Sequence, residues 1–229
     1  MTESSDLPLA AGKKKNILVV SYLMVSIWYM ISLFLNLDQV IFYLKPCLML
    51  PLIGWVFSSF SYSNRNILLA ALIFSWAGDT LLLFSKDNSR FFLLGLCAFL
   101  MAHIFYIYLF RKTIQAHPQK SKFNATFLLV AVYGLVLLYF LWPGLHEMKI
   151  PVSIYALVIC LMLFYAIKTA LLLSGNFGIW LILGAISFVL SDSILAVNKF
   201  ITPFAGAGIM IMGTYLFAQF SITKACLQE

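Results

Sequence analysis

Charged residues are scarce in this sequence: Asp, Glu, Lys and Arg together make up 10% of the 229 residues. Soluble domains have about a quarter of their residues charged and about half apolar, whereas 63% of this chain is hydrophobic. A soluble core of this length cannot bury so much apolar surface, so a lipid bilayer must solvate much of it. The composition therefore excludes a soluble globular domain and predicts an integral membrane protein.

Cysteine is also rare, and its four occurrences are isolated in apolar stretches, at Cys47, Cys97, Cys160 and Cys226. No CxxC pair is present, which argues against a disulfide framework and against a structural zinc site. The formal net charge of +7 could indicate a nucleic-acid partner, but the basic residues stand in short connectors between apolar runs. Membrane orientation explains these residues better, so no nucleic-acid partner is expected.

Long apolar runs make up most of what remains. About 20 apolar residues cross the hydrocarbon core as one helix. On this criterion the sequence predicts eight spans, at 17–35, 40–60, 66–85, 91–110, 123–142, 152–173, 178–198 and 204–222. The connectors are too short to form a second domain. We therefore expect an all-α, polytopic transmembrane bundle of eight helices, with an N-terminal tail at 1–16, one transmembrane domain at 17–223 and a C-terminal tail at 224–229.

The first apolar run follows three lysines, as the core of a secretory signal peptide would. It is longer than a typical signal-peptide core, and no small-x-small cleavage site occurs before Asn36. We therefore expect this run to be the first membrane span.

The distribution of Lys and Arg predicts the orientation, because cytoplasmic connectors carry an excess of both. With eight spans, ten of the 15 Lys and Arg residues lie on the side of the termini and five on the other side. The ten are Lys13, Lys14, Lys15, Arg65, Arg111, Lys112, Lys120, Lys122, Lys168 and Lys224; the five are Lys45, Lys86, Arg90, Lys149 and Lys199. Both termini are therefore expected in the cytoplasm, which corresponds to the inner membrane if the source is bacterial.

Five ionisable side chains fall inside the predicted spans: Lys45, Asp79, His103, Lys168 and Asp192. A charge at the centre of a bilayer costs at least about 2.5–3.5 kcal/mol, so each of them needs a reason. Lys168 lies near a helix end, where its long side chain reaches the interface. The short stems of Asp79 and Asp192 cannot do the same, which points to a site inside the membrane.

The two aspartates share a depth. Asp79 lies 13 residues after the start of its span and Asp192 lies 14 residues after the start of its own, which places both about 20 Å from the cytoplasmic side. Lys45 reaches the same layer from the second span. Two carboxyls in a low-dielectric layer should not both be charged, so we expect a protonated acid beside a charged partner. Such a pair suits general-acid chemistry on an ether-type bond; the alternative is a Lys–Asp pair that only locks helices together.

His103 is predicted near the middle of the membrane, either as a hydrogen-bonded core residue or as a helper of the acids. The other two histidines, His117 and His146, stand in connectors on opposite sides, so a three-histidine metal site is excluded. Ligation of a metal by His103 and the two aspartates stays possible. The expectation is nevertheless that the protein has no metal and no cofactor.

Two further features border the predicted site. The small residues Gly184, Ser187 and Ser191 share one face of the seventh span, which favours close helix packing beside Asp192. In the outward connectors, Lys86, Arg90 and Lys199 could meet a phosphate headgroup, although interfacial basic residues often only anchor a protein.

Five segments, in this order, carry a resemblance to a known family. They are Lys45-Pro46-x4-Pro51, Ala77-Gly78-Asp79-x2-Leu82, Gly95-x3-Phe99-x2-Ala102-His103-x2-Tyr106, Gly184-Ala185-x2-Phe188-x2-Ser191-Asp192-x2-Leu195-Ala196-x3-Phe200 and Tyr215-x2-Ala218-Gln219. With these segments the chain resembles the YhhN-like lysoplasmalogenases, a family of eight-span membrane proteins.

The resemblance implies hydrolysis of the vinyl ether bond of lysoplasmalogens, which gives a fatty aldehyde and glycerophospho-ethanolamine or -choline. The substrate would be a membrane lysophospholipid. We expect the catalytic residues to be Asp79, Asp192, Lys45 and His103, without assigning which aspartate is the acid; Lys45 would tune the pair or bind phosphate. The side chains expected to contact the substrate are Tyr106, Tyr155, Ser191, Asn198, Lys199 and Arg90.

Other functions fit the same residues. A proton-coupled transporter or flippase would use Asp79 and Asp192 as a proton relay. An intramembrane aspartyl protease would use them as a dyad, but the YD, GxGD and PAL motifs of such proteases are absent. The two acids could also have a purely structural role. No particular oligomeric state is indicated by the sequence.

Overall fold

The computed structural model describes residues 6–60, 62–86, 88–116, 125–173 and 175–228. Every element in these ranges is helical and none is a strand, which confirms the all-α prediction. The α-helices are α1 (Asp6–Phe34), α2 (Asp38–Leu44), α3 (Leu50–Ser58), α4 (Arg65–Leu83), α5 (Ser89–Ala116), α6 (Ala125–Leu141), α7 (Lys149–Leu173), α8 (Gly175–Phe200) and α9 (Ala207–Cys226). Short 3-10 helices are η1 (Lys45–Cys47), η2 (Phe84–Lys86), η3 (Trp142–Gly144) and η4 (His146–Met148).

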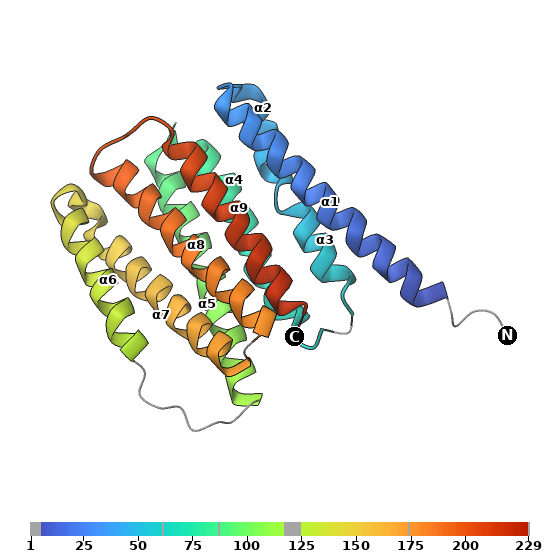
Figure 1. Cartoon of the computed structure of the whole chain (residues 1–229). Helices are drawn as coiled ribbons and strands as arrows, with labels where there is room; N and C mark the ends of the chain where they lie inside the picture. Colours follow the sequence, from blue (N-terminus) through green and yellow to red (C-terminus); the bar gives the residue numbers. More distant parts are fainter. Residues whose placement is uncertain (1–5, 61, 87, 117–124, 174, 229) are drawn as a thin grey trace.

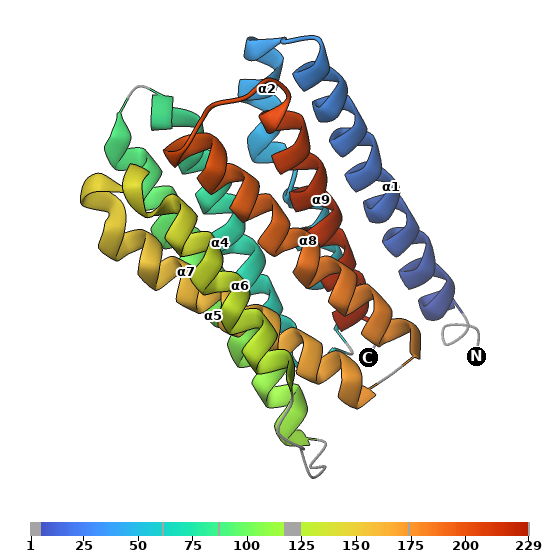
Figure 2. The same cartoon turned by 60° about the vertical axis from the view of Figure 1, so that its left-hand side comes forward.

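The long helices lie side by side in a bundle (Figure 1). α8 occupies the middle of it, in contact with α7 on one side and α9 on the other. α5 packs against both α4 and α7, α6 covers α7, and α1 and α3 pack beyond α9. Figure 2 shows that the first turns of α1 and the last turns of α9 lie at the same end of the bundle. The described chain therefore begins and ends on one side.

The second predicted span is interrupted, because two prolines divide it into α2, η1 and α3. Pro46 stands at the start of η1 and Pro51 at the start of α3, positions where a missing N–H costs nothing. The break exposes the carbonyl of Pro46, and Trp76 Nε1 on α4 donates a hydrogen bond to it at 2.7 Å. Lys45 lies at this break. Its backbone is thus displaced from the straight helix that an uninterrupted apolar run would form.

Among the described residues, seven helical stretches are long and apolar enough to cross a membrane, and they correspond to the first seven predicted spans. The chain is a multi-pass membrane protein. The region of the eighth predicted span forms α9, a helix of 20 residues that falls outside this set. The apolar sequence of α9 is interrupted by polar residues, yet Tyr215, Gln219, Ser221 and Thr223 are all buried. Its lower hydropathy therefore reflects its position against α8 inside the bundle.

Close packing of α8 against α9 confirms the prediction made from the small residues of the seventh span. A Cβ atom added to Gly184 would lie 2.8 Å from the Ile222 side chain and 3.0 Å from that of Ser221. About two turns further along, Ser191 Oγ donates a hydrogen bond to the carbonyl of Ile211 at 2.9 Å. The absence of a side chain at Gly184 thus brings the backbone that carries Asp192 close to α9.

Candidate active site

A cavity of about 670 Å³ opens among α1, α2, α4, α5, α8 and α9. Asp79 from α4, Asp192 from α8 and Lys45 from η1 all line it. Its other polar lining residues are Tyr29, Asp38, Ser85, Ser191, Asn198, Lys199 and Tyr215. Gly208 and leucine, isoleucine, methionine and phenylalanine side chains form the rest of the wall. The equal depth expected for Asp79, Asp192 and Lys45 thus corresponds to a shared cavity in the structure.

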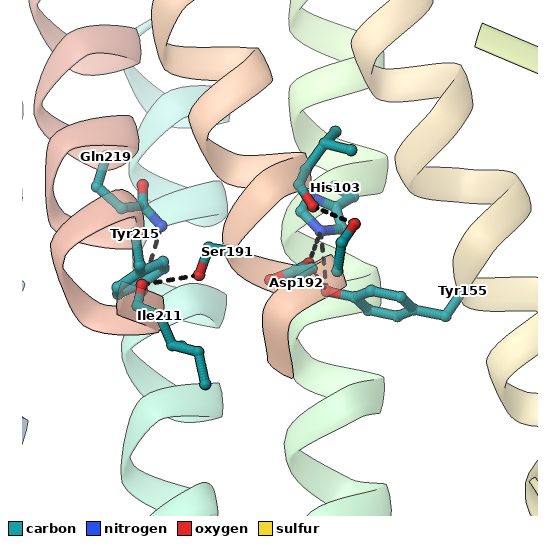
Figure 3. A network of polar contacts seen from close by, with 9 residues as sticks. His103, Tyr155, Ser191, Asp192, Ile211, Tyr215 and Gln219 are labelled. Atoms are coloured by element: carbon teal, nitrogen blue, oxygen red, sulfur yellow. Dashed lines mark hydrogen bonds and ion pairs between the residues drawn. The ribbon is translucent and has the colours of Figure 1, made fainter. Parts of the chain in front are cut away.

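Asp192 is held by two side chains that reach it from other helices. Tyr155 on α7 donates its hydroxyl to Asp192 Oδ2 at 2.5 Å. His103 Nε2 on α5 lies 3.3 Å from the same oxygen and 3.0 Å from the Tyr155 hydroxyl. Figure 3 shows the two side chains meeting at Asp192 from different helices. The His103–Asp192 contact is the one approach within 4.0 Å between a basic and an acidic side chain among the described residues, and it is an ion pair only when His103 is protonated.

The imidazole of His103 is fully buried, and its other nitrogen, Nδ1, has no hydrogen-bond partner among the described residues. A buried N–H without an acceptor is unfavourable. The neutral tautomer that carries its hydrogen on Nε2 is therefore preferred, with that hydrogen directed toward the Tyr155–Asp192 pair. In this arrangement Asp192 Oδ2 accepts from both neighbours. The ring edge also packs against Phe188, with the centroids 4.7 Å apart.

Asp79 has a different set of partners and is 2% exposed. Tyr215 on α9 donates its hydroxyl to Asp79 Oδ2 at 2.7 Å. Gln219, one turn further along α9, donates its amide to the Tyr215 hydroxyl at 3.2 Å, and the Gln219 carbonyl accepts from the Tyr106 hydroxyl at 2.7 Å. These contacts form a directed chain of hydrogen bonds from α5 through α9 to α4. This series of hydrogen bonds fixes the orientation of the Asp79 carboxyl.

No hydrogen bond joins the two carboxyl groups in the part of the chain that the structure describes. Phe188 lies between their networks, since its ring meets His103 edge-on and also contacts Tyr215 at 5.5 Å between centroids. Equal depth has therefore produced two separately supported acids that face one cavity, and not a directly bonded dyad. The expectation of a protonated acid beside a charged carboxylate in this cavity stays a prediction.

Lys45 lines the cavity without forming an ion pair within 4.0 Å to either aspartate, as judged over the described residues. A Lys–Asp pair that only locks helices together is therefore not what the structure contains. No group of three His, Cys, Asp or Glu side chains within the described ranges is placed to hold a metal ion. The Asp–Asp–His ligand set that the sequence left open is thus not assembled here.

The residues expected to contact a substrate divide into two groups. Ser191, Asn198 and Lys199 line the large cavity. Tyr155 contacts Asp192 and borders two small hollows beside it, each of about 40 Å³. Tyr106, by contrast, is buried behind Tyr215 and does not line the cavity.

Two more expected site residues lie away from the cavity wall. Arg90 is exposed near the start of α5 and is not part of the wall. His103 is also absent from the wall and touches the cavity only through Asp192. Arg90 and His103 therefore lie off the cavity wall, and the roles that the sequence suggests for them stay predictions.

Sequence reasoning missed several residues of the site. Tyr215 and Gln219 occur in the last of the family segments, but no site role was assigned to them. Their signal is a pair of polar residues four apart in an apolar helix, which places both on one face. Asp38 and Tyr29 were missed because a connector acid and an aromatic residue in a membrane helix are both common. Only the folded chain brings them to the cavity.

Comparison with known proteins identifies the family. The model of the YhhN family matches residues 40–226, which include Lys45 and both aspartates. The chain belongs to the YhhN family. No solved structure matches the chain.

Three curated relatives illustrate the match. "Lysoplasmalogenase TMEM86B" of Homo sapiens is 31% identical over 194 residues, which are 80% of this chain and 73% of that protein. The protein of the same name from Sus scrofa is 34% identical over 170 residues, covering 73% of this chain and 66% of the relative. "Lysoplasmalogenase" of Mycobacterium tuberculosis (strain CDC 1551 / Oshkosh) is 32% identical over 163 residues, covering 70% and 60%. This YhhN-family chain thus spans three fifths to three quarters of these relatives.

Proposed function

We propose that this YhhN-family protein hydrolyses the vinyl ether bond of lysoplasmalogens to a fatty aldehyde and glycerophospho-ethanolamine or -choline. The observation that carries the proposal is that Asp79 and Asp192, from two helices of a membrane protein, line one cavity and are each oriented by a tyrosine hydroxyl. The names of the relatives support the same substrate.

The chemistry of a vinyl ether fits two carboxyl groups. Protonation of the β-carbon of the double bond produces an oxocarbenium ion. Water adds to that cation and loses a proton, and the resulting hemiacetal breaks its bond to the glycerol oxygen. One water is consumed, and one aldehyde and one alcohol are formed. The reaction therefore needs a proton donor, a nearby anion and a base that positions the water.

The two acids receive different roles from their surroundings. Asp192 accepts hydrogen bonds from Tyr155 and His103, and such donors stabilise the ionised form of a carboxyl. We assign Asp192 as the carboxylate that stabilises the cation and orients the water. Asp79 is more deeply buried and accepts from Tyr215 alone. We assign Asp79 as the proton donor.

The remaining polar groups act around this pair. His103 does not line the cavity, so it is a positioning residue that acts through Asp192. Tyr155 holds the same carboxylate from α7. Lys45 lines the cavity in the layer of the aspartates, and its positive charge suits the phosphate of the lipid.

The finer topology is also part of the proposal. α9 would be the eighth span, because it lies along α8 and returns the chain to the end where α1 begins (Figure 2). With the excess of Lys and Arg on that side, both termini would be cytoplasmic, and the membrane would be the inner one if the source is bacterial. Residues 17–223 would form one transmembrane domain between two short tails, and the cavity would open toward the opposite side.

The proposal is tested with the purified full chain in detergent. We expect incubation with a lysoplasmalogen to release a fatty aldehyde, and incubation with an acyl lysophospholipid of the same headgroup to release no fatty acid. The acyl lipid serves as the control, since it differs only at the sn-1 linkage. Release of fatty acid, or of no product from either lipid, would contradict the proposal.

A proton-coupled transporter is the second candidate, and one observation favours it. The hydrogen-bonded chain Tyr106–Gln219–Tyr215–Asp79 is buried and continuous, as a proton relay would be. A transporter makes no chemical product in detergent. It would instead move lysolipid or protons across the membrane of a sealed proteoliposome, and this activity would depend on Asp79.

A further inference from the structure

Apart from Tyr29, the polar residues of the cavity wall divide into two layers along the bundle axis. Asp79 and Ser85 are six residues apart along α4 and η2, and Asp192 and Lys199 are seven apart along α8. These separations correspond to about 9–10 Å of helix. α4 and α8 both run toward the end of the bundle where α1 passes into α2 (Figures 1 and 2). Ser85 and Lys199 therefore lie nearer that end than the two carboxyls do.

α2 repeats this arrangement in the opposite direction. Its first residue, Asp38, stands at that same end, and Lys45 follows seven residues later, about 10 Å further in. We call the four polar residues at that end the outer layer; they are Asp38, Ser85, Asn198 and Lys199. The inner layer consists of Lys45, Asp79, Ser191, Asp192 and Tyr215.

The outer layer carries one charge of each sign. Asp38 and Lys199 are both exposed, and neither belongs to an ion pair within 4.0 Å over the described ranges. Lys199 Nζ lies 5.0 Å from the centroid of the Phe92 ring, which also lines the cavity, so its ammonium is held at the wall. A zwitterion likewise carries two opposite charges that are held apart. Asp38 and Lys199 match it, because each has the charge opposite to one of its groups and neither is already in an ion pair within the described ranges.

The spacing of the layers matches the length of a lysoplasmalogen. Three bonds of an extended chain span about 3.5 Å. The five bonds from the ether oxygen to the phosphorus therefore reach about 6 Å, and the nine bonds to the headgroup nitrogen reach about 10 Å. With the vinyl ether at the inner layer, the nitrogen arrives at the outer layer. The phosphate lies between the layers, within reach of the long Lys199 side chain.

We propose that the outer layer is a binding site for a zwitterionic headgroup, in which Asp38 binds the ammonium of ethanolamine or choline and Lys199 binds the phosphate. The site rests on the proposed function and makes it more specific, because it selects amine-bearing lysoplasmalogens. Asp38 lies outside residues 40–226, the range that matches the family model. Membership of the family therefore does not by itself supply this headgroup contact.

The experiment compares two lipids with the purified full chain in a non-ionic detergent. One is the ethanolamine lysoplasmalogen, and the other is its phosphomethanol counterpart, which keeps the phosphodiester charge and lacks the amine. We expect wild type to have a higher kcat/KM with the ethanolamine lipid. We expect Asp38→Asn to lower the ratio of the two kcat/KM values by about twofold to fivefold, as suits a carboxylate–ammonium contact near water. A choline lipid, tested in the same way, shows whether the site accepts both amines.

Glu147→Gln is the matched control. Glu147 is an exposed acid of η4, outside the cavity wall, so its loss changes the net charge equally. This variant is expected to keep the wild-type ratio. An unchanged ratio in Asp38→Asn, or an equal fall in Glu147→Gln, overturns the headgroup site.

A binding measurement separates failure of the site from failure of the proposed function. The saturated 1-O-alkyl analogues of both lipids have no vinyl ether and are not substrates for this chemistry. We expect Asp38→Asn to weaken binding of the ethanolamine analogue selectively, by the same factor as in the kinetic comparison. If wild type releases no aldehyde, the proposed function fails, and the binding ratio still decides whether Asp38 recognises the amine. Equal affinities of wild type and Asp38→Asn for the ethanolamine analogue reject the site.

Discussion

Asp79 and Asp192 are two residues of one type that face one cavity, but packing has given them different surroundings. Asp192 lies at the junction of α5, α7 and α8, where a phenol and an imidazole converge on one oxygen. Asp79 accepts from a single phenol, that of Tyr215, which ends a buried series of hydrogen bonds between α5 and α9. The number of donors around each carboxyl, more than its depth, decides whether it is better suited to remain charged or to carry a proton.

Removing either carboxyl should have the largest effect. We expect Asp79→Asn and Asp192→Asn each to lower kcat for aldehyde release by about 10²–10⁴-fold, the usual contribution of a general acid or base. The residual activities distinguish the roles. If Asp79 is the proton donor, the residual rate of Asp79→Asn rises in proportion to hydronium concentration, because hydronium replaces the missing acid. The residual rate of Asp192→Asn should not rise in this way, because Asp79 still supplies the proton in that variant. Identical pH dependences would contradict the assignment.

Removing the phenol hydroxyl that donates to each carboxyl compares how much Asp192 and Asp79 depend on their hydrogen-bond donors. Tyr155→Phe takes a donor from the charged Asp192 and should lower kcat by about 10- to 100-fold, since a hydrogen bond to a charged group contributes about 1.5–3 kcal/mol. Tyr215→Phe removes the hydrogen-bond donor from a protonated Asp79 and should lower kcat by about tenfold or less. Both should leave KM within about twofold, because each phenol donates to a carboxyl and in the proposed mechanism acts through it, which for Tyr155 replaces the substrate contact expected from the sequence.

Tyr22→Phe is the control for this pair. It removes a buried phenol hydrogen bond to the carbonyl of Leu216, away from the large cavity. We expect Tyr22→Phe to lower the Tm and to leave kcat unchanged. A larger loss of kcat in Tyr215→Phe than in Tyr155→Phe would reverse the order of the two acids.

The smallest effect on chemistry is expected where α8 meets α9. Gly184→Ala places a Cβ within 2.8 Å of Ile222, and overpacking of this kind costs about 1–3 kcal/mol of stability. Gly213→Ala on α9 is the matched control, since its added Cβ meets Met30 at an ordinary 3.5 Å. We expect a lower Tm in detergent for Gly184→Ala alone, with kcat reduced only a few fold. Equal Tm values would show that the close contact does not hold the two helices.

Much of the architecture could be predicted from the sequence, because membrane spans are set by one-dimensional hydropathy. Counting residues along two spans was enough to place Asp79 and Asp192 in one layer with Lys45. The same counting could not show that Pro46 breaks a helix at Lys45, since an apolar run containing proline can kink, break or continue. Nor could it show that the polar residues of α9 point inward.

The partners of each acid could not be predicted, because they depend on the rotation and neighbours of every helix. Nothing in the spacing of His103 and Asp192 shows that α5 and α8 bring them together, and Tyr155 joins them from a third helix. Tyr106 was expected at the substrate and lies behind Tyr215 instead. Tertiary packing determined these contacts, and local sequence patterns do not encode it.

The most direct test of the central claim is the isotopic composition of the aldehyde released in D₂O. Carboxyl-catalysed protonation of the vinyl ether places one solvent hydrogen on the carbon next to the aldehyde group. The wild-type product should therefore carry a single deuterium there when it is trapped at once, and authentic aldehyde incubated with Asp79→Asn should show the background exchange. An aldehyde that contains no deuterium at this carbon would mean that the bond is broken without protonation by an acid of this cavity.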